Sequence, residues 1–353
     1  MKIMTDSTKK ASGVAFTLLV LIGVGMAIMF SVDRAVEGNA MLRDERDGDL
    51  MLRRLVIDEI THAGQFLPPA EPKDKNEARK KEDFSRLPVT YWHPRGPVGQ
   101  VLSQYDWFPG RENTWRSDAR LPASLVGLGA SMGPLPIDQL AAAWSEPPIA
   151  GLPLKAGALA AYARPFQVVD FYEPKPAIYE LSFPRSGEPK FTFVHDAQRR
   201  GAMIRVFQGN ERELLGTRAP ERFYHAFFVD TVRGDFDDLA EDLLTEEGMA
   251  ALMATVAENG ILAFHVSNKK YDVVPVIADV ATNLKFACML AEDRNDRGKG
   301  HYPSEWVLVA RRPEALANLN RGAGEIRWSA PVPRRRHAWT DAGPRERDEL
   351  RRR

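Results

Sequence analysis

The chain has 353 residues, of which 44% are apolar, and its 48 basic side chains are balanced by 48 acidic ones. This composition supports a folded core of one sizeable α/β domain with appendages and argues against a general nucleic-acid binder, which would carry excess positive charge. The single cysteine, Cys288, excludes an internal disulfide framework, and the seven histidines show no metal-ligand spacing. We therefore expect neither a metal nor nucleic acid among the ligands.

Residues 11–32 contain no charged side chain and include the run LLVLIGVGMAIMF. This length is that of one helix spanning a bilayer, so we expect a membrane anchor that follows a tail of residues 1–10 and contacts lipid. The alternative is a secretory signal peptide with Lys9 and Lys10 as its positive region, but the run is long for a signal and no small-residue cleavage site follows. The charges that flank the run do not decide the side of the membrane.

The segments after the anchor predict a stalk and then a small β region. Residues 33–51 are charged and indicate a helical or extended stalk. Residues 52–120 form the β region: Leu52–Phe66 alternates as a strand pair, and residues 68–86 are a polar, lysine-rich loop. A second β element is expected over Leu87–Leu102, where aromatic and β-branched residues are frequent.

Residues 121–312 predict the main domain, and residues 313–353 an arginine- and proline-rich tail with weak structure. Strands and helices alternate at a spacing typical of a mostly parallel, right-handed, doubly wound α/β sheet. The expected strands are Val168–Tyr172, Ile204–Phe207, Ala226–Val229, Ile261–Phe264 and Glu305–Ala310. The expected helices are Ile137–Trp144, Ala158–Ala163, Thr245–Glu258 and Asp272–Leu284.

Asp230 is the first site candidate. The apolar run Ala226–Val229 is typical of a strand buried on both faces, and Asp230 follows it directly. Ligands of open α/β sheets bind beyond the carboxyl ends of the strands. After this acid we expect a helix with Thr245 as its N-cap and with Asn259 and Gly260 at its end.

Six sequence blocks in the same order resemble the spermidine synthase (polyamine aminopropyltransferase) family, in particular its bacterial membrane-fused relatives. The blocks are RRLVIDEITHAGQ, YWHPRGPVGQVL, AAYARPFQVVDFYE, VFQGNERELL, YHAFFVD and ILAFHVSN, and the likeness runs from about Arg53 to Arg312. The resemblance implies a Rossmann-like S-adenosylmethionine-dependent transferase sheet preceded by a β-hairpin element. Relatives often carry many membrane helices, whereas the single apolar run here predicts a single-pass protein, and we expect it in a bacterial inner membrane with its globular part in the cytoplasm.

The resemblance further implies a co-substrate, decarboxylated S-adenosylmethionine or S-adenosylmethionine itself, bound without a metal. Gly151 and Gly157 match the family's glycine turn, although residues 153–155 (Pro-Leu-Lys) stand where relatives have small residues. Glu173 ends the next strand and matches the acid that binds the ribose hydroxyls. Asn210 replaces the acid that meets the adenine amino group; a turn asparagine is the alternative interpretation.

For the acceptor amine, the resemblance implies Asp230 as catalytic base and Asp235 as a second acid of the same loop. Gln65 and Tyr91 match positions that line the polyamine groove of relatives. His265 and Asn268 match a further block of the membrane-fused relatives, and for a strand-end histidine a structural hydrogen bond is the expected role.

Three functions stay open at this point. The first is aminopropyl transfer from decarboxylated S-adenosylmethionine to a diamine, or to another amine, with Asp230 as base. The second is a catalytically degenerate binding or scaffold module that keeps the fold, because three features depart from the family pattern at one ligand: the glycine turn, Lys175 in place of an acid two residues after Glu173, and Asn210. The third is an S-adenosylmethionine-dependent methyltransferase. A homo-oligomer and a membrane partner are both open as states of assembly.

Overall fold

The computed structural model describes residues 32–37, 39–68, 84–104, 146–295, 298–320, 325–334, 338–345 and 347–351. The predicted anchor, residues 11–32, lies outside these residues except for Val32, which begins a strand. Most of the polar loop 68–86 and the predicted helix Ile137–Trp144 also lie outside them. Among the described helices none is long and apolar enough to cross a membrane.

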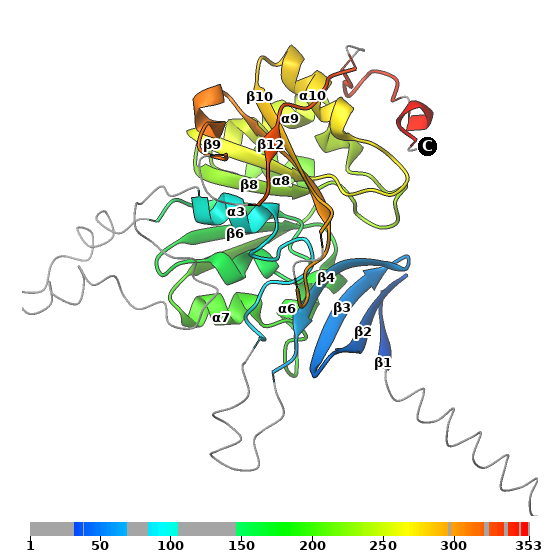
Figure 1. The fold of residues 1–353 in the computed structure, drawn as a ribbon. Coiled ribbons are helices and arrows are strands. Elements are labelled where there is room, and N and C mark those ends of the chain that lie inside the picture. Colours follow the sequence, from blue (N-terminus) through cyan, green and yellow to red (C-terminus); the bar gives the residue numbers. More distant parts are fainter. Residues whose placement is uncertain are drawn as a thin grey trace, which may run out of the picture.

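An antiparallel four-stranded sheet opens the described chain, in the order β1-β2-β3-β4 (Figure 1, blue). Its strands are β1 (Val32–Glu37), β2 (Ala40–Asp47), β3 (Leu50–Ile57) and β4 (Ile60–Phe66). The predicted strand pair is confirmed, but the predicted stalk over residues 33–51 is wrong. Those residues form β1, β2 and the start of β3. In β2 apolar and charged residues alternate, and Asp44 pairs with Arg53 of β3: Arg53 Nε and Nη2 each donate to Asp44 at 2.7 Å.

The second β element predicted over Leu87–Leu102 is also wrong. The described part of this segment makes one isolated bridge, between Thr90 and His301, and then forms helix α3 (Pro97–Gln104). Pro97 opens the helix because its fixed φ suits the first turn, where its missing N–H group costs no hydrogen bond.

The main sheet has eight strands in the order β12-β10-β11-β9-β8-β5-β6-β7. Its central part, from β9 to β7, is parallel as predicted, whereas β11 is antiparallel to both of its neighbours and β12 to β10, so the whole sheet is mixed. The parallel strands are β5 (Ile149–Leu152), β6 (Val168–Glu173), β7 (Met203–Gln208), β8 (Tyr224–Asp230) and β9 (Val256–His265). The remaining strands are β10 (Ala287–Asp293), β11 (Ser304–Ala310) and β12 (Trp328–Ser329).

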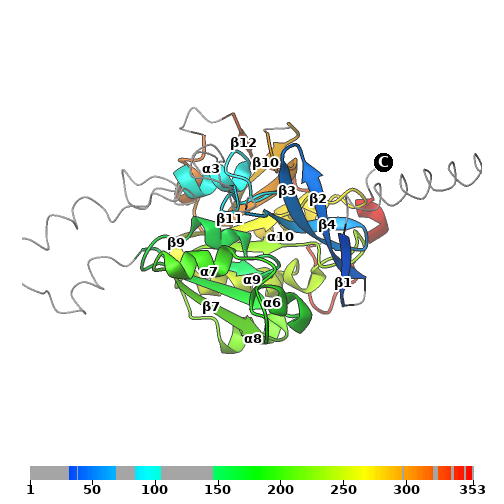
Figure 2. The ribbon, with the colours of Figure 1, turned by 90° about the horizontal axis from the view of Figure 1, so that it is seen from below.

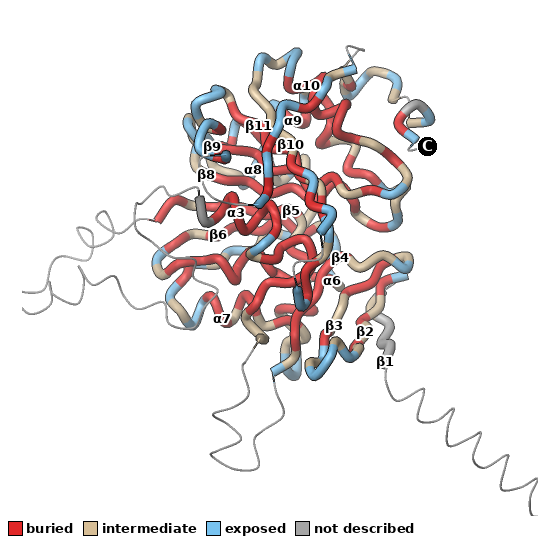
Figure 3. Tube along the Cα trace, in the orientation of Figure 1, coloured by how far each residue is buried: buried red, intermediate tan, exposed pale blue. Residues whose placement is uncertain are grey.

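The residues of the central strands are mostly buried (Figure 3), and their alternate side chains belong to two core clusters on opposite faces of the sheet. On one face, Ile149 and Phe228 share a core cluster with α3, with the 3₁₀ turn η1 (Ala158–Tyr162) and with α7 (Phe193–Arg199). On the other, Ala150 and Phe227 share one with α8 (Glu211–Thr217), α9 (Glu246–Thr255) and α10 (Val274–Asn283). The short helix α6 (Pro176–Ser182) packs instead against the small sheet, which lies beside the main sheet in Figures 1 and 2.

Helix α9 begins as expected, with the Thr245 hydroxyl accepting a hydrogen bond from the Gly248 amide at 3.0 Å. It ends at Thr255, earlier than predicted, and Gly260 lies inside β9 instead of ending the helix. The reason is close packing: a Cβ atom on Gly260 would lie 2.8 Å from the Tyr224 carbonyl oxygen, beside the register shift between β8 and β9. Glycine here serves a β-bulge.

Gly248 provides a test of close approach between backbone segments. A Cβ atom at this position would lie 2.2 Å from the carbonyl oxygen of Asp242 in the 3₁₀ turn η2 (Glu241–Leu243). We expect Gly248→Ala to lower the free energy of unfolding by about 1–3 kcal/mol, measured by urea denaturation. Gly216→Ala in α8 is the control, because nothing lies within 4 Å of the new methyl group. It is expected to be neutral or to stabilise by up to about 1 kcal/mol, and equal losses at both positions would contradict the steric argument.

The described parts of the C-terminal segment are held against the main domain, so the prediction of a weakly structured tail is wrong. Trp339 and Leu350 are buried in the same cluster as α9 and α10. Arg347 bonds Glu241 and donates from Nη1 to the Asp237 carbonyl at 3.1 Å. The segment therefore fastens the loop that follows Asp230.

Candidate functional site

Two charged side chains meet where the order of the parallel strands reverses. The chain passes from the central strand β5 outward to β6 and β7, and returns to place β8 on the other side of β5. Ligands of doubly wound sheets bind at this switch point, beyond the carboxyl ends of the two strands. Asp230 ends β8. Lys155 lies in the turn between β5, which contains Gly151, and Gly157, the residue before η1.

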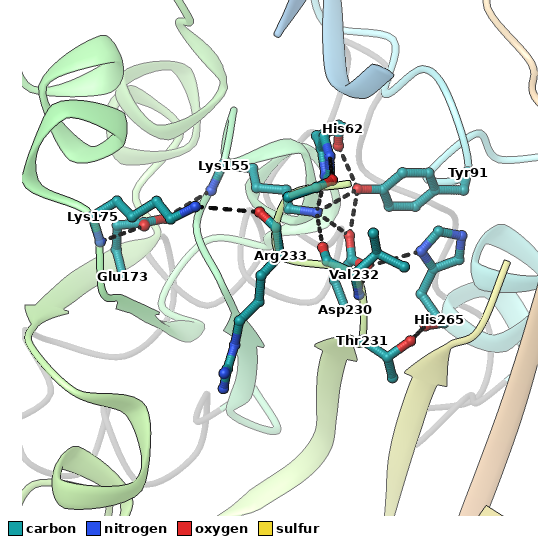
Figure 4. A network of polar contacts seen from close by, with 11 residues as sticks. His62, Tyr91, Lys155, Glu173, Lys175, Asp230, Thr231, Val232, Arg233 and His265 are labelled. Carbon is teal, nitrogen blue, oxygen red and sulfur yellow. Dashed lines mark hydrogen bonds and ion pairs between the residues drawn. The ribbon is translucent and has the colours of Figure 1, made fainter. Parts of the chain in front are cut away.

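The Lys155 ammonium group lies inside this switch point (Figure 4). It forms an ion pair with Asp230 Oδ2, and its Nζ atom lies 2.9 Å from His62 Nδ1 and 3.1 Å from the Val232 carbonyl oxygen. A lysine ammonium has three donors, so these three acceptors satisfy it completely. The Lys155 side chain is only 7% exposed, and its backbone has φ +48°, in the left-handed region that glycine adopts more readily.

Asp230 is buried and bonded on both carboxylate oxygens. The Tyr91 hydroxyl lies 2.7 Å from Oδ2, which Lys155 also contacts, while Oδ1 faces His265 Nδ1 at 3.1 Å and the Val232 amide at 3.2 Å. Burial alone would raise the pKa of Asp230, but the charge of Lys155 and the contact with His265 hold that pKa well below its ordinary value. The carboxylate is therefore ionised and has its hydrogen-bonding positions filled.

His62 from β4 completes the cluster from the small sheet. Burial, followed by the charge of Lys155, lowers the pKa of His62 to about 3. The ring is thus neutral, with Nδ1 facing the lysine and Nε2 2.7 Å from the Gly234 carbonyl oxygen. Tyr91 stacks on His265 with ring centroids 3.9 Å apart, and its hydroxyl also contacts the His62 carbonyl oxygen.

The glycine turn is closed by the protein itself. A Cβ atom on Gly151 would lie 3.0 Å from Leu159 and 3.2 Å from Phe171, and one on Gly157 would lie 2.6 Å from Val194. The cavity that remains among these residues and Lys155 has a volume of about 10 Å³. That is about the space of one water molecule, so a nucleoside does not fit here in this conformation.

Glu173 also faces its own chain. Its carboxylate accepts hydrogen bonds from the Lys155 amide at 3.2 Å and from the Lys175 amide at 2.9 Å. Burial raises the pKa of Glu173 to about 7, and the two amides oppose that rise. The resemblance assigns this acid to a ribose, but both of its oxygens are already bonded.

The other predicted site residues make contacts of a structural kind. Asn210 caps α8 by accepting a hydrogen bond from the Glu213 amide at 3.1 Å. Asp235 is exposed and accepts hydrogen bonds from the amides of residues 237 and 238 at 2.8 and 2.9 Å. Gln65 is buried and joins β4 to Thr192, the residue before α7, through both ends of its amide. Of the predicted residues, Asp230 and Tyr91 are the pair that the structure brings together.

A larger cavity of about 400 Å³ opens on the other side of Asp230. Tyr91, Asp230 and His265 line its inner wall, and residues of the small sheet and of the segment before β11 line the rest. Asp230 therefore lies between two cavities, one of about 10 Å³ at the glycine turn and one of about 400 Å³ on its other side.

Two residues of the cluster, Lys155 and His62, were not predicted as site residues. A signal for Lys155 exists, because it is the single charged residue between Ala150 and Ala163. A lone charge in such an apolar stretch predicts a buried ionic partner. His62 offers no comparable signal, because its role depends on how the small sheet docks.

No protein-family model matches the sequence, and no curated protein sequence matches it. Among solved structures, the chain is similar to a probable spermidine synthase from Corynebacterium glutamicum, with 11% identity, a TM-score of 0.46, and 86% of this chain and 91% of that one covered. It is also similar to spermidine synthase from Thermotoga maritima, with 11% identity, a TM-score of 0.39, and coverage of 82% and 74%. A predicted O-methyltransferase from Agrobacterium tumefaciens has 18% identity, a TM-score of 0.31, and coverage of 46% and 72%. Spermidine synthases are thus among the solved structures similar to this chain, as the six sequence blocks predict, and at these identities the likeness concerns the fold alone.

Proposed function

We propose that this chain is a non-catalytic module with a spermidine synthase-like fold. The observation that carries the proposal is the ion pair between Lys155 and Asp230 at the switch point of the sheet. The resemblance places the acceptor amine at this carboxylate, and here the side chain of Lys155 supplies an ammonium group from within the chain. Because this amine belongs to the protein, it cannot leave as a product, and while it is bound Asp230 is not available to a substrate amine.

The nucleoside side of the site supports the same proposal. A nucleoside needs space at the glycine turn and free acceptor atoms at the ends of β6 and β7. The turn encloses about 10 Å³, the Glu173 carboxylate is bonded to two amides, and Asn210 caps a helix. The residues present therefore do not fit S-adenosylmethionine or its decarboxylated form in this conformation, and we assign no reaction step to either.

Aminopropyl transfer is the second candidate. The observation that favours it is the cavity of about 400 Å³ beside Asp230 and Tyr91, two residues that the resemblance assigns to the amine. This function would require Lys155 to leave Asp230 and the glycine turn to open when the co-substrate binds.

Calorimetric titration of the full-length chain with methylthioadenosine, S-adenosylmethionine and decarboxylated S-adenosylmethionine separates the two candidates. We expect no binding of any of the three by a chain that circular dichroism shows to be folded, while a working spermidine synthase titrated in parallel binds. Binding of the decarboxylated form together with transfer to a diamine would overturn the proposal in favour of the second candidate. Preference for intact S-adenosylmethionine would point to methyl transfer.

A further inference from the structure

Two buried polar atoms without a hydrogen-bonding partner lie on the wall of the 400 Å³ cavity. They are His265 Nε2 and Ser304 Oγ, from residues that are 5% and 3% exposed. His265 pairs with Trp306 across β9 and β11, and Ser304 precedes Trp306 by two residues, so the two side chains lie on the same face of the sheet. Buried polar groups nearly always have partners, and two such atoms in one cavity point to a ligand.

The hydrogen bond between His265 Nδ1 and Asp230 leaves the other ring nitrogen, Nε2, for a ligand. His265 Nδ1 faces the Asp230 carboxylate, which can only accept, so Nδ1 carries a proton. Figure 4 shows the other ring nitrogen turned away from Asp230. With a proton on Nδ1, this nitrogen accepts a hydrogen bond in the neutral ring and donates one in the charged ring, and a hydroxyl group satisfies either form. The Ser304 hydroxyl can donate or accept, so the two atoms together suit a hydroxyl group.

The carboxylates inside the cavity do not call for a cation. Asp230 is bonded by Lys155, Tyr91, His265 and the Val232 amide. Asp293, the other buried acid, faces His301 Nε2 at 3.1 Å. Glu305, a half-buried acid that also lines the cavity, is not free either. An ammonium ligand would lose its hydration and find these carboxylates already engaged, whereas a neutral hydroxyl ligand has far less hydration to lose.

We propose that this cavity binds a small uncharged molecule bearing hydroxyl groups, held by His265 Nε2 and Ser304 Oγ, and that Lys155 excludes free amines by occupying Asp230. The inference deepens the proposed function and rests on the internal ion pair described there. The volume of about 400 Å³ lies within the range of small-molecule sites, which is roughly 300–1,000 Å³. His265 and Ser304 are binding residues in this account, and Lys155 determines specificity.

The test compares two probes of equal length, 1,4-butanediol and 1,4-diaminobutane, by ligand-observed NMR titration of the full-length chain. Molecules of this size bind at roughly millimolar Kd, which this measurement covers. We expect the diol to bind at least about tenfold more tightly than the diamine, because an ammonium finds no unpaired carboxylate. Ser304→Ala should weaken diol binding about fivefold, the effect of losing one hydrogen bond.

The Lys155→Met variant should invert the preference, since Asp230 then lacks its cation and a diamine can supply one. The double variant Lys155→Met/Asp230→Asn has neither charge and should bind the diamine no more tightly than the diol. It also serves as the folded reference if the single variant does not fold.

Diamine binding to the unaltered chain as tight as diol binding would overturn the inference, and so would failure of the folded chain to bind the diol. Neither result depends on nucleoside binding, which the titration with methylthioadenosine tests separately. A chain that binds methylthioadenosine and still prefers the diol would contradict the non-catalytic proposal alone.

Discussion

Replacing Lys155 by methionine is expected to lower the free energy of unfolding by roughly 3–5 kcal/mol. The substitution keeps most of the side-chain volume but leaves the Asp230 carboxylate buried without its cation. Asp230→Asn should have a cost of the same order, because it leaves the buried ammonium of Lys155 without its anion. Urea denaturation of both variants at neutral pH, with the far-ultraviolet circular dichroism signal as readout, measures the two costs.

The double variant Lys155→Met/Asp230→Asn should be destabilised by clearly less than the sum of the two single variants, because it contains no unpaired buried charge. The control is Arg185→Met, which breaks a 2.9 Å ion pair with Glu180 at an arginine side chain that is 89% exposed. Such a surface pair contributes about 0–1 kcal/mol. If Lys155→Met costs no more than Arg185→Met, the buried ion pair does not have the role assigned to it.

Glu173 is expected to make the stability of the protein fall between about pH 4.5 and pH 7. Burial raises its pKa from 4.5 to about 7, so over this interval the folded chain binds a proton that the unfolded chain has released. Stability due to this group is therefore highest below pH 4.5 and is lost as the pH rises to 7, by roughly 3 kcal/mol in total. Glu173→Gln cannot ionise and should not show this loss.

The measurement is the free energy of unfolding of both proteins in urea at pH 5, 6, 7 and 8. The free energy of unfolding of Glu173→Gln minus that of the unaltered chain should rise by roughly 2–3 kcal/mol from pH 5 to pH 8. The loss of one amide contact shifts this difference equally at every pH. His62 and His93 act with the opposite sign: burial lowers their pKa values to about 3 and about 4, so stability due to them is lost as the pH falls below 6.5. The two histidines are present in the unaltered chain and in Glu173→Gln, so their contributions cancel when the two proteins are compared. A pH-independent difference would show that Glu173 is not held in this environment.

Much of the main sheet could be predicted because its strands are short apolar runs, whose length and β-branched or aromatic residues favour a strand over a helix. The run before Asp230 is buried on both faces, with Phe227 and Phe228 in opposite core clusters, as its composition predicts. The Thr245 cap is equally local, because it depends on one side chain and an amide three residues later. The stalk prediction failed for a non-local reason: Asp44 and Glu45 pair with Arg53 and Arg54 of the neighbouring strand β3, which the pattern within the segment does not reveal.

At the site, the position of Asp230 was predictable and its surroundings were not. The apolar run predicts an acid at a strand end. Its three side-chain partners are Tyr91 from the segment before α3, Lys155 from the turn after β5, and His265 from β9. Their meeting depends on how these elements pack. Gln65 matches a position that binds ligand in relatives, but here its side-chain amide bonds Thr192 and Ser85. A match in sequence did not predict its contacts.

The contacts of Arg347 with the loop after Asp230 can form only late in synthesis. The contact joins residues 110 positions apart, and the bridge between Tyr271 and Arg351 closes the same region. Chains fold from the N-terminus as they are made, so β5 and β8 can pair while this loop still lacks its restraints. The loop gains its contacts with Arg347 only after residue 347 has been synthesised, so the last residues of the chain complete a segment made more than a hundred residues earlier.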